Sequence, residues 1–466
     1  MPEFAPDLLA RWTGGRWTAQ PAVAPAGFAT DSRRLQPGQV FVALRTDRRD
    51  GHDFLAVAQA AGATAALVAR ADPAVTLPQL VVPDPLVALH AIAREHRGGF
   101  SGPVIGITGS AGKTSTKNLL ALLLGGEDGG VLATEGNLNN HLGVPLTLTR
   151  LDPARHRFAV IEAGISAPGE MAPLAAMIQP DLALITLVAP AHLAALGTVE
   201  GVAAEKSVLA TAVRPGGVAV FPKDCVRFAA FRDLLVSQLV LERSTVLRPA
   251  TLPSHTVHFN VIQRPDETVI VIAHGPPPPL VFKLRRVTDG MAQNAALALA
   301  AASRLGVPRE LLQARLAAWT PAPLRGEIRR EDGRLLYLDC YNASPASMAD
   351  ALATFVAITP PETPRLYVLG GMEELGAEAA AHHRRLGRGL WLRPGDAVWA
   401  VGPEAGAVRE GALEAGADPA QVRVAAEVAA IRPVLAEFRG AIFVKGSRSH
   451  RLETLLAAEP AAVAAH

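Results

Sequence analysis

The sequence predicts an α/β protein built from three domains. Short apolar runs alternate with alanine-rich or amphipathic helical segments along the chain, which is typical of parallel sheets covered by helices. Glycines and prolines interrupt this alternation at 96–103 and at 319–327. We therefore expect domains at 1–100, 101–322 and 323–466: a small α/β unit, a larger parallel-sheet domain and a Rossmann-like α/β domain.

The composition is that of a globular protein that binds small molecules. The chain has 466 residues, of which 49% are hydrophobic and 19% charged, so it can form large cores. Its net charge of +2, with both signs interspersed, argues against a nucleic-acid-binding surface. The two cysteines, Cys225 and Cys340, are too few for a disulfide framework. With no membrane span or signal-peptide pattern in the sequence, we expect a cytoplasmic monomer.

The elements of each domain follow from their apolar patterns. In the first domain we expect strands at 39–44, 65–69 and 79–82 and a helix at 54–63. In the second we expect parallel strands at 103–108, 158–164, 181–188 and 216–221, then a hairpin-like region at 255–284 and a helix at 293–306. In the third we expect strands at 335–341, 365–371, 397–402 and 441–446, and a helix in which His382 and His383 face solvent.

The segment GITGSAGKTSTK, at 106–117, carries the strongest chemical signal. It lies between a predicted strand and a predicted helix, where free backbone N–H groups bind phosphate oxygens. The strict P-loop pattern requires glycine where Ile107 stands, so an ordinary glycine-rich turn is the alternative. The GKTS that opens the helix favours the P-loop. Its phosphate-binding residues are then Gly109, Ser110, Ala111, Gly112, Lys113, Thr114 and Ser115, with the Thr114 hydroxyl facing Mg²⁺ and Lys113 facing the β- and γ-phosphates of ATP.

Two further side chains are expected at the same edge of the sheet. Glu162 ends one predicted strand and His192 follows the next, so both are candidates to hold Mg²⁺ or to position a phosphate. The alternatives are a capping or salt-bridging acid and an ordinary loop histidine. Lys206, in a predicted amphipathic helix, is expected from its pattern alone to be a solvated surface lysine.

Eight motifs follow one another in an order that resembles a known family. They are DSRRLQPGQVFVAL at 31–44, TGSAGKTS at 108–115, TEGNLNNHLGVPLTL at 134–148, VIEAGISAPGEM at 160–171, AHLAALG at 191–197, YNASPASM at 341–348, LGGMEELG at 369–376 and VKGSRSHRLE at 444–453. The chain resembles the Mur ligases, the ATP-dependent amide-forming enzymes of peptidoglycan precursor synthesis. The resemblance covers all three domains. It implies an enzyme that joins D-Ala-D-Ala to UDP-N-acetylmuramoyl-tripeptide through an acyl phosphate.

The resemblance also implies roles for individual residues. The first domain is expected to bind the UDP end of the substrate through Asp31, Ser32 and Arg33. Asn137 and Asn140 are implied to lie near the substrate, and Lys445, Ser447 and Arg448 near the incoming amine. Nucleotide contacts are implied for Asn294, Arg325, Asp339, Tyr341 and Asn342. Lys113, Glu162 and His192 are implied to be catalytic, with Thr114, Glu162 and His192 at the Mg²⁺ site. Lys206 matches a lysine that the family carbamylates, which reverses its surface interpretation.

The sequence departs from the family pattern near the predicted adenine site. Gly290 and Met291 replace a His–Asn pair, whereas Asn294 is retained. Ser207 and Val208 replace a glycine and a glutamate after Lys206. The alternatives to the implied activity are the preceding ligase of the pathway, which adds the third amino acid, and a degenerate ATP-binding homologue. An Asn-Pro-Arg motif, typical of the preceding ligase, is absent from the sequence.

Overall fold

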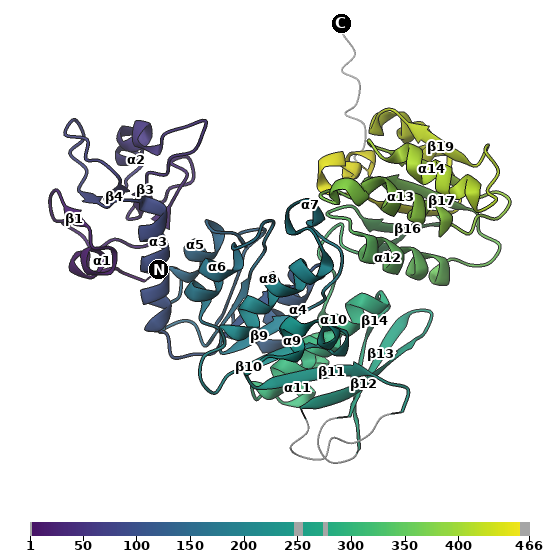
Figure 1. Ribbon diagram of the computed structural model, residues 1–466, viewed down its shortest axis with the longest axis horizontal. Coiled ribbons are helices and arrows are strands. Elements are labelled where there is room, and N and C mark those ends of the chain that lie inside the picture. The colour runs from purple at the N-terminus through teal and green to yellow at the C-terminus, as the bar shows by residue number, and fades with distance from the viewer. Residues whose placement is uncertain (1, 247–254, 274–277, 457–466) are drawn as a thin grey trace, which may run out of the picture.

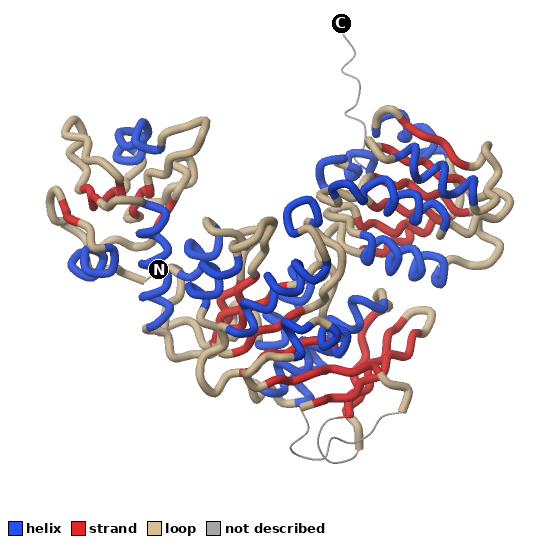
Figure 2. The backbone as a smooth tube through the Cα atoms, in the orientation of Figure 1, coloured by secondary structure: helices blue, strands red, loops and turns tan. Residues whose placement is uncertain are grey.

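The computed structural model of the chain describes residues 2–246, 255–273 and 278–456. Three α/β domains follow one another along the chain, each formed around its own sheet (Figure 1). In each of them the strands lie at the centre and helices pack outside them (Figure 2). The α/β class with three sheets is as predicted. No helix of the described residues is long and apolar enough to cross a membrane.

The first domain contains a five-stranded sheet of order β1-β5-β4-β3-β2. Its strands are β1 (Arg16–Trp17), β2 (Phe28–Ala29), β3 (Val40–Val42), β4 (Ala65–Val68) and β5 (Gln79–Val81). Its helices are α1 (Pro6–Thr13), α2 (Leu55–Ala60) and α3 (Pro85–Gly98). The fully buried β4 packs between the cores on the two faces of the sheet, which explains its uninterrupted apolar sequence.

The segment at 96–103, interpreted from its glycines and proline as a linker, begins inside a helix. α3 continues to Gly98, and the Arg97 side chain is fully buried. Its guanidinium donates to the carbonyls of Ile178 (2.9 Å) and Gln179 (2.8 Å) and to Asp181 Oδ2 (2.7 Å). A buried guanidinium requires such partners, so α3 is anchored to the second domain rather than joined to it by a free segment.

The second domain contains a nine-stranded sheet of order β14-β13-β12-β11-β10-β9-β6-β8-β7. Its strands are β6 (Val104–Thr108), β7 (Val131–Ala133), β8 (Phe158–Glu162), β9 (Leu182–Ile185), β10 (Val218–Pro222), β11 (Gln238–Arg243), β12 (Thr256–Gln263), β13 (Glu267–Ala273) and β14 (Leu280–Arg285). The strands from β7 to β12 pair in parallel, and β12, β13 and β14 pair antiparallel. The parallel β6, β8, β9 and β10 and the hairpin-like region were predicted, whereas β7 and β11 were not.

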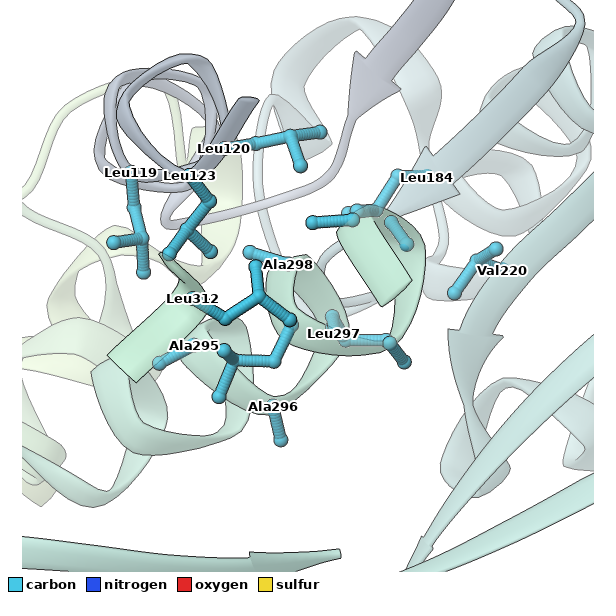
Figure 3. Close-up of a cluster of buried hydrophobic side chains, with 14 of the residues drawn as sticks. Leu119, Leu120, Leu123, Leu184, Val220, Ala295, Ala296, Leu297, Ala298 and Leu312 are labelled. Carbon is cyan, nitrogen blue, oxygen red and sulfur yellow. The ribbon is translucent and has the colours of Figure 1, made fainter. Parts of the chain in front are cut away.

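Helices cover both faces of this sheet. They are α4 (Lys113–Leu124), α5 (Gly143–Leu148), α6 (Met171–Ile178), α7 (Leu193–Leu196), α8 (Val199–Thr211), α9 (Ala229–Arg232), α10 (Asp289–Arg304) and α11 (Arg309–Ala318). On one face the alanine-rich α10 packs between the α4 leucines and the strand residues Leu184 and Val220 (Figure 3). The small side chains of Ala295 and Ala298 allow α10 to approach α4 closely. The start of α10 therefore lies beside the segment that precedes α4.

The strand order places the predicted site at one edge. β6 lies between β8 and β9, with Ile107 opposite Glu162 and Thr108 opposite Ile185. The loops that follow these three parallel strands therefore meet at their common carboxyl edge. The P-loop segment, Glu162 and the chain leading to His192 are brought together in this way.

The third domain contains a six-stranded sheet of order β15-β16-β20-β17-β18-β19. Its strands are β15 (Glu327–Glu331), β16 (Arg334–Asp339), β17 (Arg365–Gly370), β18 (Ala397–Val401), β19 (Val422–Ala425) and β20 (Ala441–Lys445). Its α-helices are α12 (Pro345–Ile358), α13 (Ala379–Arg388), α14 (Ala405–Glu414) and α15 (Arg432–Glu437). Only β15 pairs antiparallel. Asp339 and Lys445 lie opposite each other at the carboxyl ends of β16 and β20.

The prediction that His383 faces solvent is wrong. Its side chain is buried, its Nε2 accepts a hydrogen bond from the Met372 amide (2.9 Å), and its Nδ1 contacts the carbonyl of Ala379 (2.7 Å). Arginines surround it in the sequence, but it lies on the face of α13 that turns inward with Leu386. Its imidazole holds the loop after β17 against α13.

Candidate active site

A cavity of about 780 Å³ lies between the second and third domains. The predicted site residues that line it are Ser110, Ala111, Gly112, Lys113, Thr114, Ser115, Asn137, Asn140, Glu162, His192, Asn294, Arg325, Asp339, Tyr341, Asn342 and Lys445. Those that do not line it are Asp31, Ser32, Arg33, Gly109, Lys206, Ser447 and Arg448. The structure thus collects the predicted phosphate and nucleotide residues in one place.

The P-loop requires glycine at two positions for steric reasons. Gly109 has φ 154°, and a Cβ atom there would lie 1.9 Å from Thr186 Oγ1. Gly112 has φ 78°, and a Cβ atom there would lie 2.1 Å from Asn294 Nδ2. The next residue, Lys113, starts α4, and its Nζ donates to the carbonyl of Gly109 (2.8 Å). The N–H groups of the first turn of α4 consequently face the cavity beside a lysine, an arrangement that binds phosphate.

Glu162 lies directly beside the P-loop. Its carboxylate Oε1 accepts hydrogen bonds from Thr114 Oγ1 (3.1 Å) and from Asn139 Nδ2 (2.8 Å). Its Oε2 is buried and has no hydrogen-bond partner among the described residues. An unpaired buried carboxylate oxygen is costly, so it indicates a site for a cation.

These residues fit Mg²⁺ held together with a nucleotide. No cluster of three His, Cys, Asp or Glu residues that could hold a metal occurs in the described part of the chain. Mg²⁺ is usually bound through one or two carboxylates, with waters and substrate phosphates completing its shell. Glu162 and the Thr114 hydroxyl supply that smaller set beside the P-loop. They fit a nucleotide-bound Mg²⁺ rather than an all-protein cage.

His192 reaches the cavity from the N-terminus of α7, in a left-handed backbone conformation (φ 53°). Its Nδ1 pairs with the carboxylate of Glu374 in the third domain, and the Glu374 carbonyl accepts from the Ala194 amide (3.3 Å). Burial lowers the pKa of His192, and the Glu374 charge opposes this shift. Glu374 therefore joins the third domain to the candidate Mg²⁺ residue, a contact that sequence reasoning did not identify.

Lys206 is completely buried on α8, so the surface interpretation made from its pattern is wrong. Its Nζ has no hydrogen-bond partner among the described residues. The neighbouring Glu205 is used elsewhere, since its carboxylate accepts from the amides of Gly169 (2.9 Å) and Met171 (2.7 Å). Burial, and then the charge of Lys113, lower the pKa of Lys206 well below its ordinary value. Burial and the Lys113 charge thus favour the neutral amine, which is the form of lysine that can react with CO₂.

Replacing Lys206 with methionine is expected to raise the free energy of unfolding by about 1–3 kcal/mol in bicarbonate-free buffer at pH 7, because a buried polar group without a partner is removed. Burial disfavours the protonated form of Lys206 in the folded state, so the stability of the parent protein rises with pH between the lowered folded-state pKa and the ordinary lysine pKa. Methionine abolishes this contribution. Thermal unfolding across pH, with exposed Lys223→Met as the control, measures both effects. A variant that is less stable than the parent would contradict the prediction.

The third domain adds cations and an aromatic ring to the cavity. Arg325 Nη2 donates to Thr114 Oγ1 (3.3 Å), and its guanidinium carbon lies 3.8 Å from the centroid of the Tyr341 ring. Lys445 Nζ pairs with Asp339 Oδ2 (2.6 Å) and donates to the carbonyl of Asn342 (3.1 Å). Lys445 therefore lies with the predicted nucleotide turn at 339–342.

The other predicted substrate residues lie elsewhere or serve the local fold. Asn140 Oδ1 accepts from the amide of Gly143 (2.9 Å) and so supports the start of α5. Ser447 Oγ accepts from the Glu373 amide (3.2 Å), and Arg448 pairs with Glu453 (2.8 Å). In the first domain Arg33 pairs with Asp31 (2.7 Å), which lowers the pKa of Asp31 to about 2. Neither pair lines the cavity.

Asn139 is a site residue that was not predicted from the sequence. It lies between Asn137 and Asn140 in the same asparagine-rich segment, and its amide is the one that contacts Glu162. The close packing of Asn139 also explains why residue 164 is a glycine, because a Cβ atom at Gly164 would lie 2.9 Å from Asn139 Cγ. The repeated asparagines marked the segment, but they did not show which side chain turns toward the carboxylate.

Fold and site together define a class of protein: a three-domain P-loop protein whose nucleotide site is completed by its third domain. Three family descriptions match it, the Mur ligase family catalytic domain at 26–97, the Mur ligase middle domain at 107–302 and the Mur ligase glutamate ligase domain at 324–448. The UDP-N-acetylmuramoyl-tripeptide–D-alanyl-D-alanine ligase of Escherichia coli K12 is 34% identical over 92% of each chain. The chain belongs to the Mur ligase family.

Solved structures agree with this assignment. MurF from Acinetobacter baumannii superimposes with a TM-score of 0.86 at 30% identity and covers 98% of both chains. MurF ligase from Thermotoga maritima, in complex with ADP, gives a TM-score of 0.77 at 27% identity over 92% of this chain and 96% of that one. The predicted three-domain α/β ligase fold is confirmed by these neighbours.

Proposed function

We propose that this chain is the ATP-dependent ligase that joins D-Ala-D-Ala to UDP-N-acetylmuramoyl-tripeptide, making the pentapeptide precursor of peptidoglycan. The names of its relatives and structural neighbours support this activity. The observation that carries the proposal is the meeting, in one cavity, of the P-loop lysine, a buried carboxylate with a free oxygen, and the third-domain Arg325.

The chemistry requires activation of a carboxylate, because oxide is a very poor leaving group. The terminal carboxylate of the tripeptide takes the γ-phosphoryl group of ATP, giving an acyl phosphate and ADP. The amine of D-Ala-D-Ala then attacks the acyl carbon, loses a proton, and phosphate leaves. Both steps join anionic partners, so the protein contributes mainly charge neutralisation and alignment. Lys113 and Arg325 supply fixed positive charge to the phosphates.

We assign the Mg²⁺ contacts to Glu162, Thr114 and His192. When bound, Mg²⁺ neutralises phosphate charge and orients the phosphoryl group. The Glu162 Oε2 atom, free of hydrogen bonds, supports its role as a ligand. For His192 to take part, its Nε2 must face the site, because Nδ1 is occupied by Glu374.

We also propose that Lys206 is carbamylated. The reaction of its neutral Nζ with CO₂ forms an N–C bond and releases one proton, which converts a buried amine into an anion. The buried, unpartnered Nζ and the nearby Lys113 charge support this assignment. The test is ¹³C NMR of the protein in ¹³C-labelled bicarbonate. A carbamate signal that is present in the parent protein and lost in Lys206→Ala supports the assignment.

The proposal also covers the domain bounds, the substrate-binding residues, the oligomeric state and the location of the protein. We place the domains at 1–100, 101–322 and 323–466, and we assign Asp31, Ser32 and Arg33 to the UDP end of the substrate. Ser447 and Arg448 are assigned to the side of the incoming amine. The chain is proposed to act as a monomer in the cytoplasm, which sedimentation of the purified protein would test for the oligomeric state.

The deciding experiment measures phosphate release from ATP in the presence of Mg²⁺ and UDP-muramoyl-tripeptide. It is carried out with and without D-Ala-D-Ala. Release that requires both substrates, with a pentapeptide product by mass, is expected. Turnover only with a dipeptide substrate and a diamino acid would assign the preceding ligase step instead. ATP binding without any turnover would indicate a degenerate homologue.

The stacking of Arg325 on Tyr341 predicts coupling between the two residues. No carboxylate pairs with Arg325 in the described residues, so the aromatic ring is what holds its guanidinium beside Thr114. A double-mutant cycle with Arg325→Ala and Tyr341→Ala is expected to give a coupling energy of about 0.5–2 kcal/mol in ADP affinity. Calorimetric titration measures it. Tyr341→Phe, which keeps the ring, should preserve ADP affinity, and strictly additive alanine effects would contradict the prediction.

A further inference from the structure

The altered adenine segment has a structural counterpart in the third domain. Asp350, on α12, places its carboxylate at the first turn of α10, where Oδ2 accepts from the Gly290 amide (3.0 Å). The Thr288 side chain and the Asp289 backbone also lie close enough to this carboxylate to favour its charged form. A third-domain anion thus occupies the N-terminus of a second-domain helix, where the helix dipole stabilises negative charge.

Gly290 leaves the room that this contact needs. A Cβ atom at this position would lie 2.6 Å from Asp350 Oδ2, closer than carbon and oxygen can approach. Any larger side chain at 290 therefore displaces the carboxylate. The glycine at position 290, which departs from the family pattern, and Asp350 therefore form one contact. The sequence pattern did not reveal it.

The contact lies on the wall of the cavity and continues to the P-loop. Gly290, Met291, Asn294 and Asp350 all line the cavity. Asn294, one turn after Gly290 on α10, packs against Gly112, where a Cβ atom would lie 2.1 Å from its Nδ2. Residues four apart lie on the same helix face, so the helix that Asp350 holds at one turn contacts the phosphate loop at the next.

Burial raises the pKa of Asp350, with a smaller contribution from the charge of Asp289, although the nearby Thr288 side chain and the hydrogen bond from Gly290 act in the opposite direction. Holding a carboxylate in a half-buried site is unfavourable unless its donors stay in place. The contact therefore favours one position of α12 relative to α10.

We propose that Asp350 is a positioning residue for the nucleotide: from the third domain it holds the first turn of α10 against the P-loop, and Gly290 is the residue that admits it. This inference rests on the proposed ligase function. It assigns to the third domain a part in shaping the base end of the nucleotide site. Asp350 acts through α10, and Met291 and Asn294 are the side chains that α10 presents to the cavity.

The test uses four variants of the full chain. Asp350→Ala removes the carboxylate, and Gly290→Ala keeps the carboxylate but fills its space. Asp350→Asn keeps an acceptor oxygen and serves as the conservative rescue. Asp289→Asn is the matched control, because the Asp289 carboxylate lies on the same helix turn but pairs with Arg243 (3.0 Å) within the second domain.

The first readout is amide hydrogen exchange at 289–292 in the nucleotide-free protein, which does not depend on activity. Asp350→Ala and Gly290→Ala are expected to speed exchange of the Gly290 amide about tenfold, the equivalent of one charge-assisted hydrogen bond. The Met291 amide bonds to Thr288 Oγ1 (3.0 Å) within the helix, so it should remain protected and report that α10 is still folded. Asp289→Asn should leave exchange unchanged.

The second readout separates KM for ATP from kcat. Both disruptive variants are expected to raise KM for ATP about tenfold and to change kcat by less than about threefold, with Asp350→Asn intermediate. Unchanged exchange at Gly290, or a fall in kcat at constant KM, would overturn the inference. If the parent protein shows no ligase turnover, the proposed function fails, while the exchange experiment still decides whether Asp350 holds α10.

Discussion

Lys113→Ala is expected to lower kcat by about 10²–10³-fold, by analogy with the loss of one preorganised donor to a developing anion. The Lys113 side chain lies among Glu162, Glu374 and Arg325, and burial lowers its pKa while Glu162 opposes the shift. In the free protein its Nζ turns back to the Gly109 carbonyl, so it is held at the P-loop before phosphate arrives. No other lysine lines the second-domain wall of the cavity among the described residues.

Single-turnover formation of ADP and phosphate measures this loss. Lys223→Ala, an exposed lysine of the same domain, is the matched control and should retain the parent rate. Thermal unfolding confirms that the Lys113 variant is folded. A Lys113→Ala protein with a kcat within about threefold of the parent would show that the P-loop lysine does not act on the transferred phosphoryl group.

Glu162→Gln is expected to lower kcat/KM about 100-fold and to raise the Mg²⁺ concentration needed for half-maximal activity. Glutamine keeps the size of the side chain and the acceptor for Thr114 or Asn139, but it removes the charge that makes the free Oε2 a ligand. The effect arises from cation affinity, so high Mg²⁺ should restore part of the rate.

Activity as a function of Mg²⁺ concentration separates this from a folding defect. Glu200→Gln, at an exposed position in the first turn of α8, is the control. A Glu162→Gln enzyme that is slow at every Mg²⁺ concentration, with an unchanged Mg²⁺ midpoint, would assign Glu162 to hydrogen bonding rather than to the metal.

The elements of the fold were predictable wherever local pattern determines them. The apolar runs that became β6, β9 and β10 are buried along their whole length, and β8 is buried except at its first residue, so their sequences carry a clear signal. β1 and β2, of two residues each, carry too little pattern to be found, and β7, β11, β15 and β19 were not predicted. The helix α3 was not predicted, and the glycines after Arg97 suggested a linker, whereas tertiary hydrogen bonds hold that arginine against the next domain.

Site residues were predictable where their positions follow from the order of strands and helices along the sequence. Strand–turn–helix order was sufficient to place Lys113 and Thr114, and parallel pairing was sufficient to place Glu162 and His192 at the same edge. Glu374, Asn139 and Asp350 were missed. Two of these three contact the site from another domain, and a sequence pattern holds no information about which surface a distant loop meets.

By itself, the sequence determined the class of the fold, the P-loop, the family and many of the polar residues that line the cavity, because each of these depends on local spacing or on a motif. Only the tertiary structure decided that Lys206 is buried without a partner, that His192 meets Glu374, and that Gly290 leaves room for Asp350. The physical reason is that burial, the loss of hydrogen-bond partners and close approach are properties of packing between segments far apart in the chain, and they exist only once the domains meet.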